Sequence, residues 1–166
     1  MFPISHFNIT RTPFYYYDKT LLSNTLAKLI RLAGERNYHI HYAVKANANP
    51  EILKLIAASG IGADCVSGGE IKAALEAGFP AKKIVFAGVG KADWEIEYAL
   101  EKKIFCFNVE SAEELSVIEE LAKKKENIAS IALRINPNID AHTHEYITTG
   151  LSENKFGIPI EMLDSI

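Results

Sequence analysis

The sequence predicts an α/β fold built on a parallel β-sheet, and three observations support this. Short apolar runs alternate with helix-like patterns at a repeat of roughly 20 to 25 residues, as in consecutive parallel β/α units. The runs are apolar at successive positions, which is typical of strands covered by helices. Five such runs occur up to Arg134, after which the alternation stops.

The first helices are marked by residue types that start and stop helices. A helix is predicted from Asp18, a type that caps helix N-termini, to Gly34, which acts as a stop. Its apolar positions share one face: Leu22, Leu26, Leu29, Ile30 and Ala33. A strand is predicted over 38–44 ("YHIHYAV"), and a helix over 49–60 with Asn49 as its cap.

The same alternation continues along the chain. Four further strands are predicted, over 62–67, 83–88, 104–109 and 128–135. Two of the helices between them open with the S-x-x-E pattern of a capping box, at Ser67 and at Ser111. The helix that opens at Ser67 ends near Gly78, and another is predicted from Asp93 to about Lys102.

Two architectures are compatible with these units, an open doubly wound sheet and a (β/α)8 barrel of the TIM type. No G-x-G-x-x-G opens a helix, which argues against a dinucleotide-binding sheet. After Arg134 comes a polar stretch of about 20 residues, a length typical of functional loops, and then a new helix start in "IPIEMLDSI". We therefore predict a parallel barrel that is incomplete in this chain, with about the first five β/α units.

Composition limits the function classes. The net charge of the 166 residues is −3 and 48% are hydrophobic, with charges of both signs spread along the chain. This predicts a protein without nucleic acid as a partner. A basic leader and a long apolar segment are both lacking, which predicts a cytoplasmic protein with no membrane partner. The two cysteines, Cys65 and Cys106, lie in apolar runs and are interpreted as reduced core thiols.

Lys45 follows the first predicted strand, in "HYAVKANANP". Side chains at the carboxyl ends of parallel strands converge on one mouth, where reactive groups gather. One interpretation is an ordinary β/α binding module in which the lysine extends into water or pairs with a carboxylate. The other is a partly desolvated amine that attacks a carbonyl and forms an imine. Position alone leaves both open.

Longer motifs resemble a known family. These are "YAVKANANP", "GADCVSGGEIKAALEAGF", "IVFAGVGKADWEI", "FNVESAEEL", "LRINPNID" and "HTHEYITTGLSENKFGI". The resemblance as a whole runs from about Thr12 to Gly157. Together they resemble the N-terminal part of the diaminopimelate decarboxylases, within the pyridoxal-phosphate enzymes that have an alanine-racemase-like barrel. A-V-K-A-N is shared with ornithine and arginine decarboxylases of that group. The S-G-G-E, H-T-H-E-Y-I-T-T-G and K-F-G motifs are more particular to the diaminopimelate branch.

The resemblance implies a function. Lys45 would hold pyridoxal 5'-phosphate covalently and assist proton transfer, in the decarboxylation of meso-diaminopimelate to L-lysine and carbon dioxide, the last step of lysine biosynthesis. A homodimer in the cytoplasm is implied as well. Alternatives are an arginine or ornithine decarboxylase or a racemase on the same scaffold, and a non-catalytic pyridoxal-phosphate-binding barrel. Later family motifs lie beyond Ile166, so the chain alone is expected to be inactive.

Two further residues are carried over by the resemblance as cofactor-binding positions. Arg134 would lie near the phenolic oxygen of the cofactor, although a structural ion pair at the barrel rim is an equal alternative. Asp64 would orient the amine of Lys45, with a turn or rim carboxylate as its alternative. Glu70 resembles a family glutamate too, but the capping box explains it without any chemistry.

The ends of the chain give the remaining expectations. By the resemblance, residues 1–17 contribute a strand, including "PFYYYD", to a C-terminal β-domain, and residues 18–166 form the partial pyridoxal-phosphate-binding barrel. His142 and His144 form an H-x-H pair in the polar stretch. Because no third ligand accompanies them at a recognisable spacing, no metal site is predicted.

Overall fold

The computed structural model describes residues 3–137 and 156–166. The helices are α1 (Ile4–Ile9), α2 (Lys19–Gly34), α3 (Pro50–Ala58), α4 (Gly68–Ala77), α5 (Asp93–Lys102) and α6 (Ala112–Lys124), with short 3-10 helices η1 (Val44–Ala46), η2 (Ala81–Lys83) and η4 (Ile160–Ser165). The strands are β1 (His41–Ala43), β2 (Gly62–Cys65), β3 (Ile84–Phe86), β4 (Cys106–Val109), β5 (Ile131–Leu133), β6 (Ile135–Asn136) and β7 (Ile158–Pro159).

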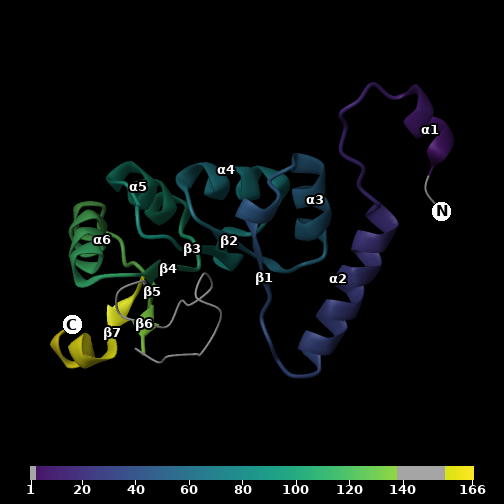
Figure 1. Ribbon diagram of the computed structural model, residues 1–166. Coiled ribbons are helices and arrows are strands. Elements are labelled where there is room, and N and C mark those ends of the chain that lie inside the picture. Colours follow the sequence, from purple (N-terminus) through teal and green to yellow (C-terminus); the bar gives the residue numbers. More distant parts are fainter. Residues whose placement is uncertain (1–2, 138–155) are drawn as a thin grey trace, which may run out of the picture.

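Strands β1 to β5 form one parallel sheet in which each strand pairs with the next one along the chain. Figure 1 shows α3 to α6 following one another along the sheet, with α2 beyond its β1 end. A doubly wound sheet reverses its strand order at a switch point, and this sheet does not. The prediction of five consecutive units of a β/α barrel is therefore confirmed.

The predicted helix caps are confirmed by their hydrogen bonds. Asp18 accepts one from the Leu21 N–H at 2.9 Å, and Asn49 accepts one from the Glu51 N–H at 3.0 Å. Ser67 and Ser111 likewise accept from the N–H groups of Glu70 and Glu114, at 3.2 and 3.1 Å. These bonds satisfy donors that every helix start leaves without an intrahelical partner.

Several predicted boundaries shift: all five predicted strands are shorter in the structure, and the one predicted over 128–135 divides into β5 and β6. Gly34 is the last residue of α2 rather than a stop beyond it, and the left-handed residue that follows is Asn37, with φ of 56°. The strand predicted over 38–44 shrinks to β1, because Val44 already turns into η1. The predicted helix start after Gly157 becomes the short strand β7, which pairs with β6, followed by η4.

The core lies between the sheet and helices α3 to α6. Its largest fully buried side chains are Phe86, Phe107, Leu53, Ile56, Ile71, Ile84, Ile96 and Ile118. Alternate strand residues point to opposite faces, so Ala63 and Cys65 join this core while Asp64 between them faces the other side of the sheet. None of the described helices combines the length and apolar composition needed to cross a bilayer.

The first 17 residues differ from the predicted strand. Within the described part of this segment, Ile4–Ile9 forms α1 and residues 10–17 contain no regular element. A strand exists only where a neighbouring strand supplies hydrogen bonds, and the neighbour expected here was a further β-domain. The division at residue 17 thus stays a prediction. His142, His144 and most of the predicted polar loop lie outside the described residues.

Candidate active site

A cavity of about 750 Å³ lies at the carboxyl ends of the parallel strands. Its lining contains all three residues predicted for the site, Lys45, Asp64 and Arg134. The other lining residues are Val66, Ala87, Gly88, Val89, Asn108, Glu110, Ala132, Leu133 and Phe156. A smaller cavity of about 370 Å³ lies at the opposite end, where β/α barrels do not place their catalytic loops.

Lys45 and Asp64 are brought together by the pairing of β1 with β2. Ala43, two residues before the lysine, lies opposite Asp64 in the register. Lys45 is exposed, whereas the Asp64 side chain is half-buried and its Oδ1 has no hydrogen-bond partner in the described part of the chain. Burial raises the pKa of Asp64, and the positive charges of Lys45 and His41 offset part of that rise.

Arg134 follows β5 directly and is held by Glu110, which follows β4. The Arg134 Nη1 donates to both carboxylate oxygens of Glu110 at 3.0 Å. The Glu110 side chain is 5% exposed and that of Arg134 is 52% exposed. Arg134 therefore forms the rim ion pair expected as the alternative, and it lines the cavity as well.

Phe156 and Gly157 of the K-F-G motif pack against this arginine. Gly157 has a φ of 102°, a backbone conformation suited to glycine, and a Cβ there would lie 2.9 Å from the Arg134 carbonyl oxygen. The Phe156 ring consequently lies under the guanidinium, with its centre 5.8 Å from the Arg134 Cζ. Phe156 thus forms part of the cavity wall next to Arg134.

Glu70 acts as predicted, as part of a helix start. Its Oε2 accepts a hydrogen bond from the Val66 N–H at 2.7 Å, one residue before the cap. Glu114 does the same at the start of α6, where it accepts from the Glu110 N–H at 2.8 Å. Both glutamates therefore fix the backbone that leads from a strand into the cavity wall.

Lys91 and Glu110 are site features that the sequence reasoning missed. The Lys91 ammonium donates to Gly88 O, Asn108 O and Glu114 Oε1 at 2.6, 2.8 and 2.6 Å. These bonds join the carboxyl ends of β3 and β4 to the start of α6. Both residues could have been identified from the sequence, because each lies near the carboxyl end of a predicted strand, as Lys45 and Arg134 do.

The two cysteines are free and buried, as predicted. Burial raises the pKa of Cys65 to about 12 and also raises that of Cys106. Because the thiolate is the reactive form, neither side chain is a nucleophile near neutral pH.

Comparison with known proteins identifies the family of this chain. The model of the family described as "Pyridoxal-dependent decarboxylase, pyridoxal binding domain" matches residues 23–166. The diaminopimelate decarboxylase of Bacteroides thetaiotaomicron is 60% identical over 100% of this chain and 43% of its own length. That of Helicobacter pylori strain J99 is 51% identical over 92% of this chain and 38% of its own length. The chain thus spans about two fifths of these relatives.

Solved structures agree. The Helicobacter pylori diaminopimelate decarboxylase complexed with L-lysine matches with a TM-score of 0.81 and 48% identity, over 94% of this chain and 40% of that one. The M. jannaschii enzyme matches with a TM-score of 0.88 and 39% identity, over 97% of this chain and 38% of that one. The chain therefore belongs to the pyridoxal-dependent decarboxylase family, in its pyridoxal-binding domain.

Proposed function

We propose that this chain is the first portion of a pyridoxal-phosphate-dependent decarboxylase that converts meso-diaminopimelate to L-lysine and carbon dioxide. The observation that carries the proposal is the cavity at the strand ends, which is lined by both Lys45 and Asp64, whose buried Oδ1 has no partner among the described residues. Relatives named diaminopimelate decarboxylase, at up to 60% identity, support the choice of substrate.

The residues of the cavity fit the cofactor. Its volume of about 750 Å³ suits a small ligand. Lys45 supplies the primary amine that an aldehyde requires, and its exposure leaves it accessible. Asp64 has a buried oxygen that finds no partner in the described part of the chain, which is unusual for a polar atom, and a ligand group would satisfy it.

Each residue has a separate part in this proposal. Asp64 orients the amine of Lys45 through its charge. Arg134 carries a permanent positive charge beside the cavity and favours an ionised oxygen on the bound group. Glu110 holds that guanidinium through its buried carboxylate. With the cofactor bound, Lys45 Nζ would also be positioned to carry a proton within the cavity.

The cofactor supplies an electron sink for the pair left behind when the carboxylate departs. The protein has to hold the reacting amine at the mouth of the barrel and keep its charged partners fixed. Rigid strand ends, rather than loops alone, carry Lys45, Asp64 and Arg134, so their relative positions are set by the sheet.

A reduction experiment tests the proposal. The full-length protein is mixed with pyridoxal phosphate, treated with borohydride and mapped by mass spectrometry. We expect the label on Lys45, its loss in Lys45→Ala, and wild-type labelling in Lys72→Ala, where a 67% exposed helical lysine is removed. A label on another position, or none, would contradict the assignment of Lys45.

Substrate identity needs a second measurement. We expect the full-length protein to release carbon dioxide from meso-diaminopimelate in preference to arginine or ornithine. Preference for either of the latter would identify a different decarboxylase, and labelling without carbon dioxide release would indicate a non-catalytic barrel. The chain alone should release none, because it spans only 43% of its Bacteroides relative.

The cellular location, oligomeric state and domain division of the protein are part of the same proposal. We propose a cytoplasmic homodimer in lysine biosynthesis, without nucleic acid or membrane partners, in which residues 1–17 belong to a β-domain and residues 18–166 to the barrel. The mixed charges, with a net value of −3, and the family relationship support this. Sedimentation of the full-length protein tests the dimer.

A further inference from the structure

The turn that carries Lys45 ends at Asn47. Residues Val44–Ala46 form η1, and the N–H of Asn47 donates to the Val44 carbonyl oxygen at 3.1 Å, which closes the turn. Asn47 itself returns to an extended conformation, with φ of −165° and ψ of 110°. The geometry of this residue therefore sets where the turn stops and where the chain leaves for α3.

The remaining polar groups of Asn47 are bound by three separate segments. Its Oδ1 accepts from the Asn49 N–H at 2.9 Å, and Asn49 is the cap of α3. Its Nδ2 donates to the Tyr17 hydroxyl oxygen at 3.1 Å, across 30 positions of sequence. Its carbonyl oxygen accepts from the Tyr42 hydroxyl at 3.1 Å. Four hydrogen bonds thus converge on one residue beside Lys45.

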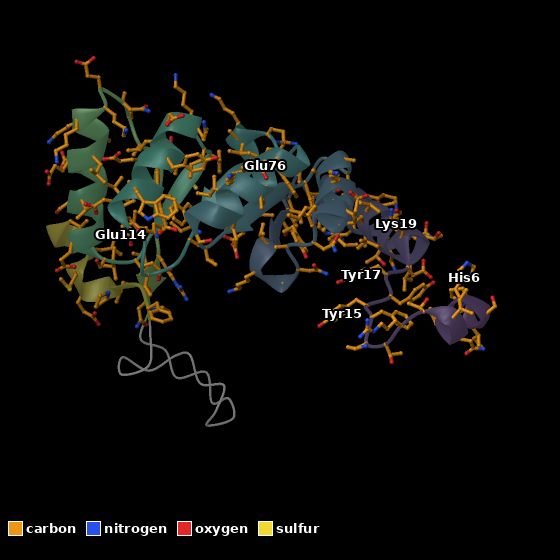
Figure 2. All side chains as sticks on the ribbon, turned by 90° about the horizontal axis from the view of Figure 1, so that it is seen from above. His6, Tyr15, Tyr17, Lys19, Glu76 and Glu114 are labelled. Carbon is orange, nitrogen blue, oxygen red and sulfur yellow. The ribbon has the colours of Figure 1, made fainter. Side chains whose placement is uncertain are left out.

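Tyr42 and Tyr17 connect this residue to different parts of the fold. Tyr42 lies in β1 and pairs with Ala63 of β2, so its hydroxyl ties Asn47 to the sheet. Burial is the main cause that raises the pKa of Tyr42, which keeps the hydroxyl protonated as a donor. Tyr17 lies on the segment between α1 and α2 (Figure 2), outside the part of the chain that the family model matches.

We propose that Asn47 is a positioning residue for Lys45, and that Tyr17 is the contact through which the N-terminal segment supports it. The inference rests on the proposed role of Lys45. An amide suits this position because it offers an acceptor to Asn49 and a donor to Tyr17 at once. The amide carries the acceptor and the donor on two separate atoms, so that both bonds can form at the same time.

A purely structural role for Asn47 would be to start α3, and the chain offers a matched control for it. Asn49 caps the same helix through the Glu51 N–H, and its side chain is not among the contacts that close the Lys45 turn. Tyr15 stacks on Tyr17 with ring centres 6.4 Å apart and is 89% exposed. Asn49→Ala and Tyr15→Phe therefore control for Asn47→Ala and Tyr17→Phe.

The rate of imine formation separates positioning from stability. The full-length variants are mixed with pyridoxal phosphate, and the imine absorbance is followed before borohydride mapping of Lys45. We expect Asn47→Ala to slow imine formation about tenfold and Tyr17→Phe about threefold, since small misplacements of reacting groups have effects of at least this size. Asn49→Ala and Tyr15→Phe should retain the wild-type rate.

A measurement without cofactor completes the test. Amide hydrogen exchange at Asn49 should accelerate in Asn47→Ala, because its N–H loses the Asn47 Oδ1 as acceptor. Wild-type rates of imine formation in Asn47→Ala and Tyr17→Phe, or equal slowing in Asn49→Ala, would overturn the inference. Failure of the wild-type protein to label Lys45 would instead overturn the proposed function, so the two failures are distinguishable.

Discussion

The ammonium of Lys91 lies 2.6 Å from a carboxylate oxygen of Glu114, on a lysine side chain that is only 1% exposed. Its two other hydrogen bonds go to the carbonyl oxygens of Gly88 and Asn108, so all three of its N–H donors are used. The second oxygen of Glu114 holds the backbone of Glu110. This one ion pair therefore connects the segments that form one wall of the cavity.

Replacement of Lys91 by methionine should lower the free energy of unfolding of the full-length protein by about 3 to 5 kcal/mol, because a buried carboxylate is left without its partner. Lys124→Met is the matched control, since Lys124 forms a pair with Glu120 at the same 2.6 Å but on side chains that are 64% and 66% exposed. Little change is expected there. Urea unfolding measures both, and equal effects would contradict the role given to burial.

The pair of Arg134 and Glu110 should respond unequally to the loss of either partner. Arg134→Met leaves the carboxylate of Glu110, 5% exposed, without a counter-charge and should cost about 2 kcal/mol. Glu110→Gln leaves an arginine that is 52% exposed and solvated, so it should cost less than about 1 kcal/mol. Urea unfolding of the cofactor-free protein compares them. A larger loss of unfolding free energy in Glu110→Gln than in Arg134→Met would show that the arginine is the partner that needs its counter-charge.

Gly62 has no room for a side chain. A Cβ there would lie 2.5 Å from the Lys83 carbonyl oxygen and 2.6 Å from the His41 Nδ1, so β2 would have to move. Gly62→Ala should therefore cost about 1 to 3 kcal/mol of unfolding free energy. Gly34→Ala, with nothing within 4 Å of the new atom at the end of α2, should instead stabilise the protein slightly. Thermal unfolding of the two variants gives the sign of each change.

Asp64→Asn should stabilise the cofactor-free protein at pH 7, by about 1 kcal/mol, because it removes a charge whose Oδ1 is buried without a partner among the described residues. The reference pKa of aspartate is 3.8, and burial raises the folded value. As the pH rises above 3.8, the unfolded chain loses its proton first, which favours unfolding until the folded pKa is passed.

The gain from Asp64→Asn should therefore vanish near pH 3 and be complete at neutral pH. Unfolding free energies of both proteins across this range test the expectation. A variant that is no more stable than the wild type at pH 7 would mean that the carboxylate has a stabilising partner. Greater stability together with slower labelling of Lys45 would support a role of Asp64 in the site.

Local patterns in the sequence determined the helix starts and the placement of Lys45. Asp18, Asn49, Ser67 and Ser111 each bond to N–H groups two or three positions ahead, so the residues that decide these helix starts are adjacent in the chain. Lys45 was found for the same reason, since a strand end is recognisable from the residues around it. The sequence motifs indicated the family without any structural information.

Only the tertiary structure decided the contacts that build the site and the order of the strands. Arg134 meets Glu110 across 24 positions, Lys91 meets Glu114 across 23, and Asn47 meets Tyr17 across 30. The sequence already favoured a barrel over a doubly wound sheet, but the strand pairing that distinguishes the two is seen only in the tertiary structure. Such contacts form because packing brings distant segments together. The position of a residue in the sequence does not indicate which distant side chain it will contact.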